Sequence, residues 1–167
     1  MTNWRPEKVM GAVAATMKTL IGIAVVGIGL TARLSLAQEA TVIELTQTPC
    51  QFIESENGVD MGFTTTKKAD CESINAKTGA ERLAKAKVLD LKPGKYIFRV
   101  ANKNVPYPLG FWLRGASLID RIRLPSVSGG GLTLGTSKDY VVELVEGEYV
   151  YSCPLNPTPN YKLIVQS

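Results

Sequence analysis

Short stretches in which side chains of two kinds alternate run through the second half of the sequence, and they limit the chain to a β fold. The clearest stretch places Tyr96, Phe98 and Val100 at every second position. Because successive side chains of a strand point to opposite faces, this spacing predicts a strand that turns these three residues toward a core.

Other segments repeat the pattern between turns that contain proline, glycine or asparagine. We expect further strands over residues 40–45, 63–66, 88–91, 109–113, 138–145, 148–153 and 161–166, and residues 51–53 are expected to be either loop or a brief strand. The run at residues 128–131 is expected to be a glycine-rich turn. Seven or eight short strands separated by turns predict an all-β fold, a Greek-key β-sandwich.

One region between the early strands departs from this pattern. From Asp70 onward, apolar residues recur among charged ones at helical spacing, which predicts a short helical insertion of about three turns, interrupted near Gly79. Glu54 and Glu56 fall in a turn-rich stretch and are expected to be solvated. The basic run at residues 121–123 is likewise expected to be a solvated face.

Residues 1–37 have the pattern of a targeting segment. Residues 20–32 are uncharged and apolar after a basic leader, and small residues precede a cleavage point after Ala37, as in a secretory signal peptide. An uncleaved N-terminal apolar helix that anchors the chain to the inner membrane is the alternative, since Lys18 could extend its amine to the membrane surface. Both alternatives place a domain of residues 38–167 in the periplasm or another extracytoplasmic space.

Charge is distributed unevenly along the chain. Residues 1–37 carry four basic residues and one acidic residue, so the remainder, with fifteen basic and fourteen acidic residues, is close to neutral. A nucleic-acid surface needs clustered lysine and arginine. No nucleic-acid partner is therefore expected.

Three cysteines follow the targeting segment, and export permits disulfides. Cys50 and Cys71 lie in the same turn-rich region and are expected to pair, which stabilises by roughly 3 kcal/mol in the chain-entropy model. Cys153 is then left over. It is either a small buried apolar residue or a reactive or metal-binding thiol.

The C-terminal half resembles a known family. A strand ends at Cys153, a loop rich in proline follows, and a closing strand returns; upstream, the stretch PGKYIFRVANKNVPYPLGFWLRG is similar to a G-x-Y-x-F-x-V-x-N segment. These landmarks resemble the cupredoxins, small blue-copper β-sandwiches, over residues 91–167. Tyr151, two residues before the cysteine, would also suit an immunoglobulin sandwich, but Trp112 lies about forty residues after Cys71, which counts against that fold.

The resemblance implies the cupredoxin fold, but the residues of this chain argue against the copper binding of that family. In cupredoxins the cysteine is followed by a histidine and usually a methionine, which all bind copper; here the loop supplies Asn156 and Thr158. The first copper histidine would fall near Pro108 or Leu109, and the whole chain contains no histidine. A blue-copper site needs a thiolate and two imidazoles, so no copper cofactor is expected, with Cys153 as a weak candidate ligand. Histidine-dependent catalytic triads are excluded as well, and no enzyme activity is expected.

The two loops that meet at one end of a cupredoxin are here rich in proline and apolar residues. They predict a partner-binding patch of Val105, Pro106, Tyr107, Pro108, Leu155, Pro157, Pro159 and Tyr161. The alternative is that the prolines only stiffen the loops in place of copper. We therefore expect an exported, non-enzymatic accessory subunit that binds protein subunits of a respiratory or photosynthetic membrane complex. A periplasmic metal-binding or electron-transfer protein that uses Cys153, or a small secreted protein with no fixed partner, are the alternatives.

Overall fold

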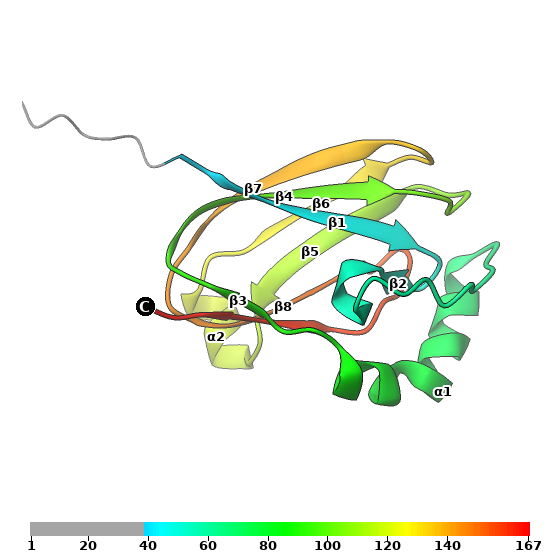
Figure 1. Ribbon diagram of the computed structural model, residues 1–167, viewed down its shortest axis with the longest axis horizontal. Helices are drawn as coiled ribbons and strands as arrows, with labels where there is room; N and C mark the ends of the chain where they lie inside the picture. Colours follow the sequence, from blue (N-terminus) through cyan, green and yellow to red (C-terminus); the bar gives the residue numbers. More distant parts are fainter. Residues whose placement is uncertain (1–38) are drawn as a thin grey trace, which may run out of the picture. The chain divides into compact units, whose positions relative to one another are not determined.

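Two β-sheets form the body of residues 39–167, the part of the chain that the computed structural model describes (Figure 1). One sheet has the strand order β2-β1-β4-β7 and the other β3-β9-β8-β5-β6. The strands are β1 (Thr41–Thr48), β2 (Gln51–Phe52), β3 (Leu89–Leu91), β4 (Gly94–Asn102), β5 (Leu109–Gly115), β6 (Val127–Leu132), β7 (Ser137–Leu144), β8 (Gly147–Ser152) and β9 (Tyr161–Val165). This mostly-β, two-sheet architecture confirms the predicted fold class, with nine strands in residues 39–167 where seven or eight were expected.

The chain crosses repeatedly between the two sheets. β1 runs parallel to β4, β3 runs parallel to β9, and the remaining neighbours are antiparallel. Strand β4, the clearest in the sequence, alternates as predicted: Tyr96, Phe98 and Val100 are buried while Lys95 and Arg99 are exposed.

Aromatic side chains from both sheets fill the core. Phe98 stacks on Phe111 with ring centroids 5.4 Å apart, and Phe52 meets the rings of Tyr151 and Tyr161 edge-on. Such pairs stabilise beyond the apolar area they bury. The core therefore joins the sheets through contacts that are distant in sequence.

Two helices and one 3-10 turn, η1 (Glu54–Glu56), accompany the sheets. The predicted insertion is α1 (Lys68–Lys85), which is longer than three turns and passes through Gly79 without a break. A single glycine weakens a helix but leaves its backbone hydrogen bonds in place. The Asp70 carboxylate accepts the backbone N–H groups of Thr66 and Lys67 at 2.8 and 3.1 Å, which lowers its pKa and caps the first turn.

Two of the expected segments are corrected, and one helix was not predicted. Residues 63–66 form no strand and instead lead into α1. Residues 128–131 belong to edge strand β6 and not to a turn, because their backbone pairs with β5. The basic run at residues 121–123 is exposed, as expected, and lies in a second helix, α2 (Leu118–Arg123), which was not predicted.

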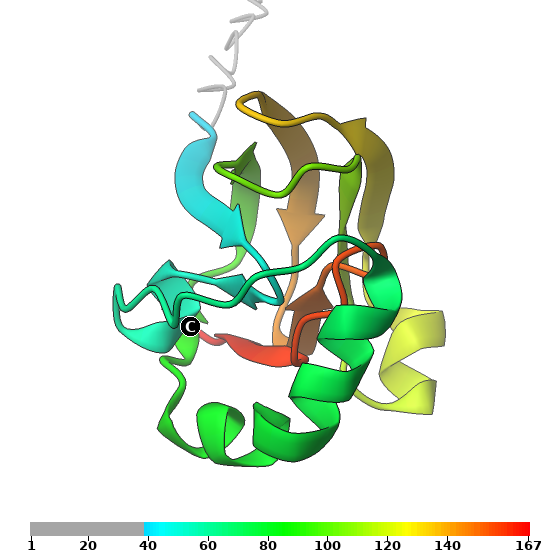
Figure 2. The same ribbon diagram turned by 90° about the vertical axis from the view of Figure 1, so that its right-hand side faces the viewer.

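The two ends of the sandwich carry different segments. The loop after Cys153 (residues 154–160, the cysteine loop) and the loop between β4 and β5 (residues 103–108, the facing loop) lie at one end, which we term the loop end. Figure 2 looks onto this end, with the cysteine loop beside the start of α1. The start of β1 and helix α2 lie at the opposite end.

The predicted N-terminal apolar helix lies outside residues 39–167. Within those residues, neither helix is long and apolar enough to span a bilayer.

Candidate functional site

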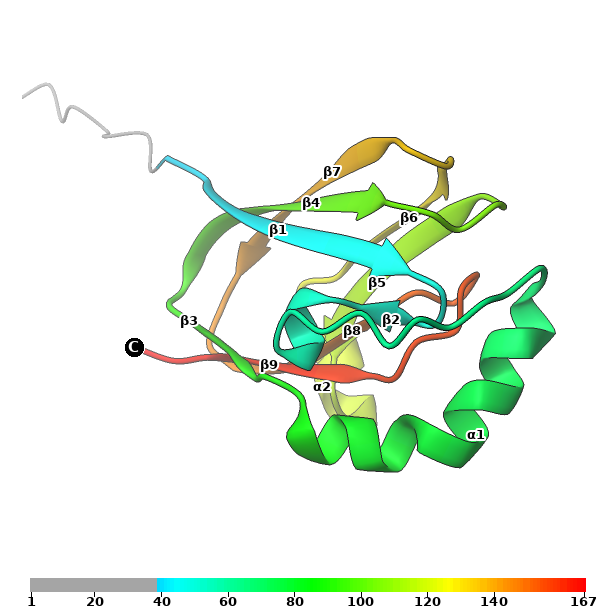
Figure 3. The same cartoon turned by 45° about the vertical axis from the view of Figure 1, so that its right-hand side comes forward.

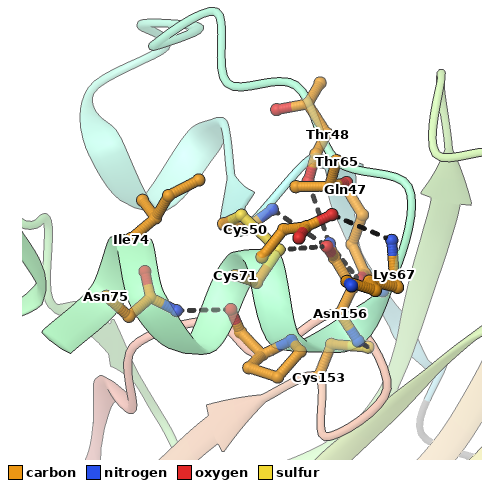
Figure 4. Close-up of a disulfide and its surroundings, with 12 residues drawn as sticks. Gln47, Thr48, Cys50, Thr65, Lys67, Cys71, Ile74, Asn75, Cys153 and Asn156 are labelled. Carbon is orange, nitrogen blue, oxygen red and sulfur yellow. Dashed lines mark hydrogen bonds between the residues drawn. A yellow bond between two sulfur atoms is a disulfide. The ribbon is translucent and has the colours of Figure 1, made fainter.

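A disulfide between Cys50 and Cys71 fixes α1 to the sandwich, as predicted (Figure 4). Cys50 lies in the tight turn between β1 and β2, and Cys71 lies in the first turn of α1. Figure 3 shows α1 outside the sheets, with β2 and η1 nearby. The bond therefore brings a helix to the loop end, next to the position of the third cysteine.

Cys153 is a free, buried thiol at the start of the cysteine loop. Its Sγ accepts the backbone N–H groups of Gly110, at 3.4 Å, and Asn156, at 3.2 Å. Burial raises the pKa of the Cys153 thiol, and these N–H groups oppose that rise only in part. At neutral pH the residue is a protonated thiol enclosed by the two loops.

Asn156 occupies the centre of the loop end and is completely buried. Its side-chain Oδ1 accepts the backbone N–H of Cys50 at 2.9 Å, and its Nδ2 donates to the carbonyl of Thr48 at 2.9 Å. Cys71 Sγ lies 3.1 Å from Oδ1; this is a contact and not a hydrogen bond, because a disulfide sulfur carries no proton. One amide thus joins the cysteine loop to the β1–β2 turn.

Gln47 continues this network into β5 and is also fully buried. Its Nε2 donates to the carbonyl of Gly110 at 2.9 Å, and its Oε1 lies 3.5 Å from Asn156 Nδ2. Buried amides are stable only when both their donor and acceptor groups are paired. Gln47 and Asn156 satisfy this condition through each other and through the backbone of Thr48, Cys50 and Gly110.

The donor set around the thiol does not fit a blue-copper centre. Leu109 is fully buried and offers no ligand atom, and Asn156 already uses both ends of its amide. Copper in such a centre needs two imidazoles beside the thiolate. Within residues 39–167, no three histidine, cysteine, aspartate or glutamate side chains gather as a metal-binding group.

A buried ion pair lies on the other side of the disulfide. The Arg82 guanidinium of α1 contacts the Glu56 carboxylate at 2.5 Å and donates to the carbonyl of Cys50 at 2.9 Å. The Tyr161 hydroxyl donates to the same carboxylate, and burial together with Glu56 raises the pKa of Tyr161. Glu56 is therefore a buried structural group, which corrects the expectation of a solvated loop carboxylate.

An open cavity of about 320 Å³ adjoins this pair, with Val59 and Met61 on its wall. Nothing in the sequence signalled the pair, because its two members lie 26 residues apart, one in a turn and one in a helix.

The structure divides the predicted partner-binding patch. Pro106, Pro108 and Leu155 are exposed, and Tyr107 and Pro157 are half-buried. These five residues lie on the two loops as expected.

Val105, Pro159 and Tyr161 are buried and cannot form part of a contact surface, which corrects the predicted patch. The side chain of Asn102 binds both the N–H and the carbonyl of Val105, and so turns Val105 into the core. Thr158 accepts the N–H of Cys153 and folds the second half of the cysteine loop inward. Tyr161 is held inside by Glu56.

Trp112 is a surface residue that the sequence analysis did not assign to the patch. It lies on the outer side of β5, stacked 4.0 Å from the Arg114 guanidinium, and 37% of it is exposed. With Pro154, Leu155 and the glycines of β6 it lines a shallow depression of about 310 Å³. The alternation of β5 could have revealed it, because Phe111 points inward and its neighbour must point outward.

No protein-family profile and no curated protein sequence matches the chain. Solved structures similar to it include cupredoxins and a multi-copper oxidase from Pediococcus acidilactici. Auracyanin B has a TM-score of 0.47 at 12% identity, over 77% of this chain and 90% of that one. Auracyanin A, a "blue" copper protein from the green thermophilic photosynthetic bacterium Chloroflexus aurantiacus, has a TM-score of 0.41 at 13% identity, over 77% of this chain and 100% of that one. Reduced rusticyanin has a TM-score of 0.41 at 16% identity, over 77% and 81% of the two chains.

Proposed function

We propose that this protein is an exported, non-enzymatic, cupredoxin-like accessory subunit that binds a protein of a membrane-associated respiratory or photosynthetic assembly through its loop end. The observation that carries the proposal is the buried amide network of Asn156 and Gln47. It lies beside Cys153 and joins the cysteine loop to the β1–β2 turn and to the start of β5. Contact through the surface of the loop end is then the function that the geometry supports best.

The surface has the character of a protein contact. Pro106, Pro108 and Leu155 are exposed on loops whose backbones are fixed by proline and by the buried network, and Trp112 adds an exposed ring. Rigid loops lose little conformational entropy when they bind. Aromatic and apolar residues at the centre of a surface patch are typical of interfaces.

A photo-crosslinking amino acid at Leu155 tests the partner contact in native membranes. We expect a discrete crosslinked product, which disappears when Trp112→Asp is introduced in the same chain. The matched control is Val145, an exposed apolar residue of similar accessibility at the opposite end. Equal products from positions 155 and 145 would contradict a partner at the loop end. Amino-terminal sequencing of the membrane-bound protein determines whether residues 1–37 are retained.

The alternative is a periplasmic metal-binding or electron-transfer protein that uses Cys153. One observation favours it: two N–H groups point at the sulfur, an arrangement that also stabilises a thiolate. Copper titration of the full chain separates the two functions. Stoichiometric copper with a thiolate-to-copper absorption band, abolished by Cys153→Ala, would establish the alternative and overturn the proposal.

A further inference from the structure

Helix α2 exposes three large apolar side chains to solvent. The exposed fractions are 77% for Leu118, 74% for Ile119 and 90% for Ile122, the highest among the large apolar residues that the structure describes. Positions i, i+1 and i+4 of a helix lie on one side, so the three side chains form a single apolar stripe. No residue of α2 itself is buried.

The helix is held by the residues that flank it and not by this stripe. Gly115 precedes it, and a Cβ there would lie 2.3 Å from the carbonyl carbon of Asp120, so the first turn packs directly on the end of β5. Leu124 follows it, is buried, and packs on Gly147 at the start of β8. The stripe is therefore not needed to position α2, and it is available to contact something outside the domain.

Charge on α2 indicates what that contact is. Arg121 lies beside the stripe and has no ion-pair partner within residues 39–167. The carboxylate of Asp120, the one acidic residue of the helix, accepts hydrogen bonds from the Ser117 hydroxyl at 2.7 Å and from the Arg123 guanidinium at 3.1 Å. Apolar residues flanked by arginine match the boundary between acyl chains and anionic headgroups of a bilayer.

The position of α2 in the fold points to the same surface. Gly115 pairs with Tyr149 at the start of β8, and the β7–β8 turn leads back to the end of the sheet where Thr41 begins β1. The described chain thus enters the sandwich at the end that carries α2 (Figure 1). Residues 33–40 separate this entry from the apolar run of residues 20–32, and eight extended residues span at most about 28 Å.

We propose that α2 docks on the surface of an anionic lipid bilayer and orients the domain with its loop end away from the membrane. The stripe enters the headgroup region and Arg121 contacts lipid phosphate. This inference rests on the membrane attachment in the proposed function, but it does not depend on the partner contact at the loop end.

The test uses the full chain reconstituted into vesicles of phosphatidylcholine with or without phosphatidylglycerol. An environment-sensitive fluorophore is attached at Ile122→Cys, since Cys153 is buried and the other two cysteines are paired. The matched control carries the fluorophore at Leu134→Cys, an exposed apolar position in the β6–β7 loop at the loop end. Vesicle flotation reports attachment, and quenching by spin-labelled lipid reports contact of the fluorophore with the bilayer.

We expect the chain to float with the vesicles, and spin-labelled lipid to quench position 122 but not position 134. Leu118→Asp together with Ile119→Asp removes the quenching without unfolding, because both side chains are exposed. Arg121→Gln weakens docking by about five-fold, and only in vesicles that contain phosphatidylglycerol, since one arginine near an anionic surface contributes about that factor.

Other outcomes overturn the inference in distinguishable ways. Flotation without quenching at position 122 would refute docking by α2 and leave membrane attachment in place. Quenching at both positions would refute the orientation. Protection of position 122 from an aqueous quencher without lipid quenching would mean that a protein covers α2. Failure to float would refute membrane attachment itself.

Discussion

Replacing Asn156 by alanine tests whether its buried amide holds the cysteine loop to the β1–β2 turn. The substitution removes the acceptor for the Cys50 N–H and the donor to the Thr48 carbonyl, both at 2.9 Å and both in buried residues. Each buried backbone group left without a partner costs about 1–3 kcal/mol, so the expected loss of unfolding free energy is roughly 2–5 kcal/mol. For a domain of this size that lowers the melting temperature by roughly 10–20 °C.

Equilibrium unfolding in urea, without reductant, measures the loss. Trp4→Phe in the background leaves Trp112 as the only tryptophan, whose ring leaves the Arg114 guanidinium on unfolding. The control is Asn104→Ala, an exposed asparagine in the facing loop, for which a change within about 0.5 kcal/mol is expected. A loss below about 1 kcal/mol for Asn156→Ala, equal to that of the control, would refute the argument that this amide holds the loops together.

Three further predictions follow from the same region. Arg82→Met leaves the Glu56 carboxylate buried without its cation and should cost about 3–5 kcal/mol in the urea titration, whereas adding Glu56→Leu should restore most of the loss. Reduction of the Cys50–Cys71 bond, which joins residues 21 positions apart, should lower the free energy of unfolding by about 3 kcal/mol. Burial raises the pKa of the Cys153 thiol above its value in the unfolded chain, which is about 8.5. Below that pH the thiol is protonated in both states, and above it the free energy of unfolding falls because only the unfolded chain ionises readily. Cys153→Ser should reduce this fall between roughly pH 8 and pH 9, below the pKa of about 10 at which unfolded tyrosines titrate, and an unchanged slope would contradict it.

Sequence patterns predicted those parts of the fold in which burial alternates along a strand. Tyr96, Phe98 and Val100 of β4 are core residues because every second side chain faces the other sheet. The same rule fails for β6, where the sequence suggested a turn. Its Gly129 is needed for close approach: a Cβ there would lie 3.0 Å from the ring of Tyr140, and that partner is distant in sequence.

The sequence predicted those features of the candidate site that depend on residues close together in the chain. Cys153 and the exposed prolines were identified by position, but the role of Asn156 depends on a turn more than one hundred residues earlier. Glu56 and Arg82 cannot be distinguished in the sequence from solvent-exposed charged residues. They become a buried pair because the fold, linked by the disulfide, places α1 against η1. Helix α2 has six residues, too few for helical periodicity to be recognised.

The buried network also determines what copper binding at Cys153 would require. Asn156 and Gln47 link the cysteine loop to β1 and β5 through the backbone of Thr48 and Gly110. An imidazole at position 156 would break the two hydrogen bonds that hold the β1–β2 turn, so it would destabilise the loops before it could bind metal. A second imidazole at Leu109 would place a polar ring in the core. Copper binding at Cys153 would therefore require changes in the hydrogen bonds that hold these segments together, and not only the addition of histidines.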